Sequence, residues 1–174
     1  MLKIKGLRKT FGSLVAAEDI NLSVAPGEAL GKDGNNLSSE VWWSPNHPFK
    51  SSLTGMSARE LASSYEAATK KQWTQPIGFV HALFEVAVDA LKRAPQRDAK
   101  ATVAAIAATN LDTVVGKVQW NGANLPPFAA KNVAKTPLVG GQWRVKDGNK
   151  YDIVITDNRT APNIPTGGKM EAIG

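Results

Sequence analysis

The pattern of apolar and polar residues in this chain changes at Gly31. The change indicates that the residues before it and the residues after it do not belong to one continuous fold. Apolar residues alternate with polar ones over 2–7 and again over 19–25, so each segment is predicted to be a half-buried strand. Residues 32–37 are polar and rich in glycine and asparagine, which predicts a loop. The sequence therefore divides into a strand-forming segment, a junction and a main segment, at residues 1–31, 32–39 and 40–174.

The main segment is predicted to carry three helices, and each has its own start signal. Ser57 and Glu60 have the spacing of a capping box, Pro76 suits a first helical turn, and Asp98 suits an N-cap. Runs of β-branched, aliphatic and aromatic residues predict short strands. The fold class expected from this mixture is α/β. The predicted helices are 57–71, 76–94 and 98–108, and the predicted strands are near 40–43, 115–120, 138–145 and 151–155.

Composition excludes several classes of function. The 174 residues contain no cysteine, so disulfides and thiolate metal sites are excluded. The net charge is +6, but lysine and arginine are scattered among acidic residues and form no nucleic-acid-binding arm. No apolar run reaches the ~18–20 residues of a membrane span, and lysine or arginine interrupts the opening MLKIKGLRK, which argues against a signal peptide. The chain as encoded is therefore expected in the cytoplasm, without a nucleic-acid partner, cofactor or metal.

The first segment, MLKIKGLRKTFGSLVAAEDINLSVAPGEALG, resembles the opening of an ATP-binding-cassette (ABC) ATPase from branched-chain amino-acid uptake systems. ATPases of that family continue directly into a phosphate loop, G-x-x-x-x-G-K-[ST], whereas KDGNNLSSE follows here and no such loop occurs in the chain. Phe11 matches the aromatic residue that stacks on adenine in that family, and plain packing at a strand end is the other interpretation. Without a phosphate loop, the resemblance implies at most a vestigial nucleotide contact at Phe11.

The main segment is similar to type I periplasmic solute-binding proteins, in the subgroup that binds branched-chain amino acids (Leu/Ile/Val) and aromatic acids. The complete fold of that family has two α/β lobes, each a parallel sheet flanked by helices, with the solute between them. The similarity covers only the C-terminal part of such a protein, so a partial fold with a depleted sheet is implied. The runs that carry it are VWWSPNHPFKSSLTG, SARELASSYEAATKKQW, QPIGFVHALFEVAVDALKRA, TNLDTVVGKVQWNG and NVAKTPLVGGQW.

The same resemblance assigns candidate ligand contacts to three aromatic residues. Phe79 falls on the ring that packs against the ligand side chain in the family, and an ordinary core position is the other interpretation. Trp42 and Trp43 fall near the hinge, and because adjacent strand residues point to opposite sides, only one of them is expected to face the cleft. The groups that hold the ligand's carboxylate and amino group in the family correspond to the missing part.

The remaining polar residues give no sign of catalysis. His47 and His81 are the two histidines, and they lack partners at metal-ligand spacing. Glu85 and Asp89 lie four residues apart beside basic residues, which indicates a solvated helix face more than an acid/base pair. No nucleophile elbow and no Cys–His pair is present. No catalytic residue is therefore assigned, and the chain is not expected to be an enzyme.

The sequence favours a component or remnant of an ABC uptake system for branched-chain amino acids or related aromatic carboxylates, of the solute-binding type. Its partners would be a small-molecule solute and transporter subunits, and intact members of the family are periplasmic. Two alternatives stay open: a nucleotide-binding ATPase fragment of the same transporter, and a non-functional fusion or interaction module. The predicted helices have too few strands to cover their apolar stripes, which predicts a homo-oligomer. The residues concerned are Leu61, Phe79, Leu83, Val86 and Ile106.

Overall fold

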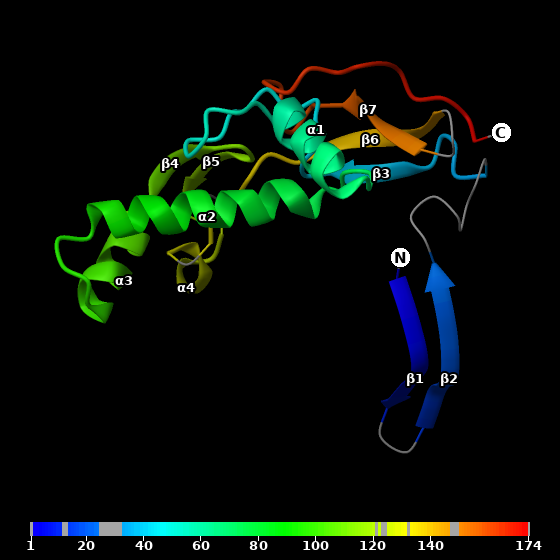
Figure 1. Ribbon diagram of the computed structural model, residues 1–174, viewed down its shortest axis with the longest axis horizontal. Coiled ribbons are helices and arrows are strands. Elements are labelled where there is room, and N and C mark those ends of the chain that lie inside the picture. The colour runs from blue at the N-terminus through cyan, green and yellow to red at the C-terminus, as the bar shows by residue number, and fades with distance from the viewer. Residues whose placement is uncertain are drawn as a thin grey trace.

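The computed structural model describes residues 2–11, 14–24, 33–120, 122, 125–131, 133–146 and 150–173, with backbone only for residues 2–24. Within these residues the protein is a mixed α/β structure (Figure 1). The helices are α1 (Ala58–Thr69), α2 (Pro76–Arg93), α3 (Ala99–Ala107) and α4 (Pro127–Ala130). The strands are β1 (Leu2–Phe11), β2 (Leu14–Val24), β3 (Ser38–Val41), β4 (Asn110–Thr113), β5 (Gly116–Gln119), β6 (Val139–Lys146) and β7 (Lys150–Asp157).

The helices begin where their capping signals predict. In α1 the Ser57 Oγ accepts a hydrogen bond from the Glu60 N–H, and the Glu60 carboxylate accepts one from the Ser57 N–H, which completes the capping box. Pro76 occupies the first turn of α2. Asp98 caps α3 by accepting from the Ala101 N–H at 2.7 Å. All three predicted helices of the main segment are confirmed to within two residues at each end.

The described strands form three small sheets, and every pairing among them is antiparallel. β1 pairs with β2, β4 with β5, and β6 lies between β3 and β7. The strands of three of these four pairs follow each other closely along the chain, and a short connection returns a strand antiparallel to its neighbour. The expectation of a depleted parallel sheet is therefore not met by the described strands, although the mixed α/β class is as predicted.

The boundary predicted at Gly31 lies outside the described residues, as does the Pro26–Gly27 stretch before it. The two strands predicted in the first segment are present as the β1–β2 hairpin, in which Leu2 pairs with Val24. Figure 1 draws this hairpin apart from the body that holds α1 to α4. Phe11 pairs with Leu14 at the end of β1.

The core joins the inner face of the β3–β6–β7 sheet to α1 and the first turns of α2. Val41, Ile153 and Ile155 on that face are buried, and Trp43 just after β3 is buried with them. Leu61 of α1 belongs to the same cluster and is 8% exposed. The prediction that Leu61 lacks a partner is therefore wrong, because Leu61 is buried within this core cluster.

The C-terminal tail runs beside β7 (Figure 1). The Gly167 N–H donates to the Ile155 carbonyl at 2.8 Å. The Gln142 side chain bonds the Glu171 backbone twice, donating from Nε2 to its carbonyl and accepting from its N–H at Oε1, each at 2.8 Å. An amide side chain thus holds the tail in the way that a neighbouring strand would.

Candidate functional site

Two of the predicted ligand-contact residues meet in the structure. The rings of Trp42 and Phe79 lie edge to face, with centroids 5.1 Å apart and planes at 67°. Trp42 follows β3 and Phe79 lies in the first turn of α2, and both side chains are half-buried. Of the three aromatic candidates, these two form a partly exposed wall.

Trp43 points the other way. Its side chain is fully buried, and its ring lies 6.0 Å from that of Trp73 at 81°. The backbone of α2 also contacts this ring directly at Gly78. The alternation expected for an extended segment thus leaves Trp42 half-buried and places Trp43 in the core.

Gln75 fixes the relative position of the strand and the helix. Its Oε1 accepts from the N–H groups of Trp42, at 2.9 Å, and Trp43, at 3.3 Å. Its Nε2 donates to the Glu40 carbonyl at 3.1 Å. Gln75 is buried and directly precedes Pro76, so one amide ties the end of β3 to the start of α2. The sequence does not indicate this role, because a glutamine at a helix start has many common uses.

Phe79 also lines an apolar hollow of about 400 Å³. Residues of α2 and α3 form one side of it, and residues around β5 and before β6 form the other. Thr136 contributes the only polar side chain with an oxygen among its lining residues, and none of them is charged. A hollow of this size and lining suits an aliphatic or aromatic group of a small molecule. It is lined by Phe79, Ala82, Leu83, Val86, Ala87, Ile106, Val115, Val118, Trp120, Ala134 and Thr136.

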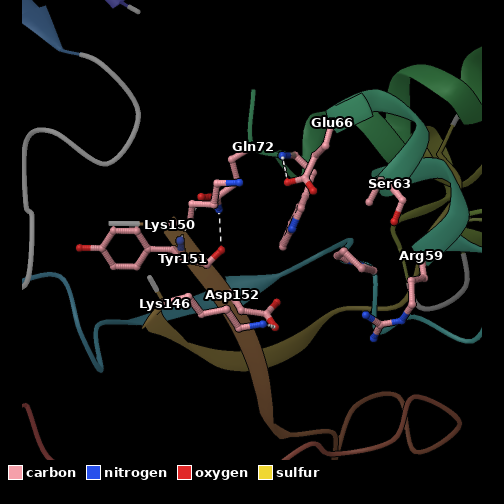
Figure 2. A pocket seen from close by; sticks show the side chains of 11 residues that line it. Arg59, Ser63, Glu66, Gln72, Lys146, Lys150, Tyr151 and Asp152 are labelled. Atoms are coloured by element: carbon pink, nitrogen blue, oxygen red, sulfur yellow. Dashed lines mark hydrogen bonds and ion pairs between the residues drawn. The ribbon is translucent and has the colours of Figure 1, made fainter. Parts of the chain in front are cut away.

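A second, polar hollow of about 190 Å³ lies between α1 and the β6–β7 hairpin. Figure 2 shows Arg59 and Glu66 on the helix side and Lys146, Lys150 and Asp152 on the hairpin side. The Lys146 Nζ lies 2.7 Å from the Asp152 Oδ2, so two of these charges already neutralise each other. This hollow shares no lining residue with the apolar one.

Glu85 differs from its predicted place on a solvated face. It is 1% exposed, and its carboxylate accepts hydrogen bonds from the N–H and Oγ of Ser52 and, at 3.0 Å, from the Val114 N–H. The segments around Ser52 and Val114 each direct a backbone N–H group toward Glu85. A buried N–H group needs an acceptor, and the Glu85 carboxylate provides it. Asp89 keeps a partly exposed position and pairs with Arg93 at 2.6 Å. The prediction is thus wrong for Glu85, which serves as a buried acceptor.

Neither histidine lies in a catalytic arrangement. The Ser51 Oγ lies 2.7 Å from the His81 Nε2, but Ser51 is 4% exposed, and its oxygen also accepts from the N–H groups of Leu53 and Thr54. This serine therefore closes a turn and is out of reach of a substrate. His47 is buried, its Nδ1 accepts from the Ser44 N–H at 3.1 Å, and burial lowers the pKa of His47 to about 4.

The described residues contain no cluster of three or more His, Cys, Asp or Glu side chains that could hold a metal ion. Among the same residues, no helix has the length and apolar character needed to cross a membrane. For Phe11 the structure describes the backbone alone, so a contact with nucleotide stays a prediction from the sequence.

No family model and no curated protein matches the chain. In fold the chain is similar to an ABC transporter substrate-binding protein from Sphaerobacter thermophilus, with a TM-score of 0.51 and 12% sequence identity. The similarity covers 73% of this chain and 32% of that protein, so this chain spans about a third of the length of the protein it matches. At this level of identity the similarity is one of fold: a mixed α/β chain that resembles part of a substrate-binding protein.

Proposed function

We propose that the chain supplies one wall of a solute-binding cleft from an ABC uptake system for branched-chain amino acids or related aromatic carboxylates. The observation that carries the proposal is that Phe79 both packs against Trp42 and lines the apolar hollow. The similarity in fold to a substrate-binding protein supports it. In this proposal residues 40–174 are the C-terminal part of a type I binding protein, residues 1–31 derive from the ATPase, and the chain is not an enzyme.

The chemistry of the hollow sets both the class of ligand and its affinity. Its apolar lining suits the side chain of leucine, isoleucine or valine, or the ring of an aromatic acid, and burying such a group contributes about 1.5–3 kcal/mol. None of the described residues that line the hollow is charged, so in this proposal the carboxylate and any ammonium group of the ligand stay in water. A dissociation constant in the millimolar range or weaker follows for one copy of the chain.

Solution NMR on the full chain tests this proposal. Leucine, valine and benzoate are each titrated into isotopically labelled protein, and shifts are followed at the indole N–H of Trp42 and at the amides of α2. We expect saturable shifts in the millimolar range that Phe79→Ala removes. Phe128→Ala is the matched control, because this phenylalanine is 82% exposed and lies outside the lining of the hollow. Shifts that survive Phe79→Ala, or no shifts with any of these ligands, would contradict the proposal.

A further inference from the structure

The outer face of α2 carries a row of exposed apolar side chains. Val80, Leu83, Phe84 and Leu91 are 52%, 70%, 63% and 58% exposed, and Ala87 lies exposed among them. Positions 80, 84, 87 and 91 follow one another at intervals of four, three and four residues. That is the heptad spacing by which one helix packs its side chains against a second helix. A helix is therefore the shape of partner that this row fits.

The same surface continues onto α3. Val103 and Ile106 are 64% and 40% exposed, and Ile106 lines the apolar hollow together with Leu83. The six large side chains on α2 and α3 offer roughly 600 Å² of exposed apolar surface per copy. If all of this surface were covered, two copies together would bury about 1,200 Å², the lower end of the range of specific, stable interfaces. The large side chains are Val80, Leu83, Phe84, Leu91, Val103 and Ile106.

We propose that a second copy of this chain docks on this surface, with the two α2 helices packed antiparallel about a twofold axis. A twofold interface uses the same patch on both copies, and an uncharged stripe can meet itself without burying an unpaired charge. Lys92 and Arg93 lie at the C-terminal end of α2. Arg93 is paired with Asp89, so parallel packing would bring the Lys92 cations of both copies together at one end, whereas antiparallel packing separates them by the length of the helix.

This arrangement would also change the hollow. Leu83 and Ala87 belong both to the exposed stripe and to the lining of the hollow. The α2 helix of the second copy would therefore lie across the mouth of the hollow and supply a wall that one copy lacks. This last step, and only this step, rests on the proposed function.

Sedimentation velocity of the full chain from about 1 to 100 μM tests the interface. We expect a concentration-dependent dimer, and Phe84→Lys should weaken it by at least about 100-fold. Phe84 does not line the hollow, so this variant disrupts the interface without changing the lining that one copy supplies. Met170→Lys is the matched control because Met170 is 63% exposed on the C-terminal tail. A monomer throughout the range, a higher oligomer, or an undiminished dimer in Phe84→Lys would each overturn the proposal.

Cysteine cross-linking tests the orientation, since the chain has no cysteine of its own. Antiparallel packing sets Val80 of one copy opposite Leu91 of the other. A mixture of Val80→Cys and Leu91→Cys chains should therefore form mixed disulfides, and each variant alone should form few. Efficient self-cross-linking of Val80→Cys would overturn the antiparallel arrangement. A dimer that gives no NMR shift with leucine, valine or benzoate would contradict the proposed function and leave the interface standing.

Discussion

The backbone of α2 touches the ring of Trp43 at Gly78: a Cβ at this glycine would lie 2.3 Å from the indole carbons. The contact brings the first turns of α2 onto the end of β3, with Trp43 sealed between them. No side chain larger than hydrogen fits there without moving either the helix or the tryptophan.

Gly78→Ala should therefore destabilise the protein by about 2–3 kcal/mol or more, although alanine is the better helix former. Urea unfolding followed by circular dichroism measures the change. Gly167→Ala is the matched control, because its Cβ would make an ordinary contact of 3.6 Å with Val154. A Gly78→Ala variant as stable as Gly167→Ala would show that α2 and Trp43 are not in close contact.

Glu85→Gln should cost about 1–3 kcal/mol of unfolding free energy. The carboxylate accepts from three donors, and a carboxamide offers one oxygen and turns an NH2 group toward the remaining donors. Asp89→Asn, on the same helix, loses only a partly exposed pair with Arg93 and should cost less than about 0.5 kcal/mol. Chemical denaturation of both variants at neutral pH compares them, and equal losses would contradict a buried acceptor role for Glu85.

The stability of the protein should fall between about pH 6.5 and pH 4 because of His47. Burial lowers the pKa of His47 from 6.5 to about 4. In this window His47 is therefore protonated in the unfolded chain and neutral in the folded chain. The contribution is fully present above pH 6.5, is lost as the pH falls toward 4, and amounts to about 3 kcal/mol at most. Unfolding free energies measured in steps across this window should fall less steeply in His47→Gln than in the parent chain. A slope in His47→Gln as steep as that of the parent chain would contradict this account.

Mg-ATP should leave the melting temperature unchanged at millimolar concentration, and hydrolysis should not exceed the buffer background. The chain lacks a phosphate loop, and positioned phosphates and magnesium are what phosphoryl transfer requires. Thermal shift and phosphate-release assays measure the two quantities. Turnover above background that disappears in Phe11→Ala would instead favour the nucleotide-binding alternative.

The helices could be predicted because their signals are local. Ser57, Pro76 and Asp98 each act within one turn of the helix that they start, so neighbouring residues suffice to fix its beginning. The strands predicted in the main segment lie within about two residues of β3, β5, β6 and β7, but β4 (Asn110–Thr113) was not predicted. The partners of the strands could not be predicted, since the pairing of β3 with β6 joins Val41 to Val139 across almost the whole main segment.

In the candidate site, too, local features could be predicted from the sequence, whereas features that depend on distant segments could not. Strand alternation predicts that Trp42 and Trp43 point in opposite directions, but which one is buried depends on the approach of α2 through Gly78. Glu85 has the neighbours of a solvated residue in sequence. Its burial follows from the Ser52 and Val114 segments, which reach it from either side along the chain. Neither the Gly78–Trp43 contact nor the burial of Glu85 can be recognised from the neighbouring residues in the sequence.

The three hydrogen bonds of Gln75 have a consequence for the thermodynamics of any ligand at the aromatic wall. They hold the backbone on both sides of the Trp42–Phe79 contact before a ligand arrives. A wall that is already ordered loses little conformational entropy when it is occupied. The heat-capacity change on binding should then follow the apolar area that is covered, without an added contribution from folding. A larger apolar ligand that covers more of the wall should therefore give a larger negative heat-capacity change.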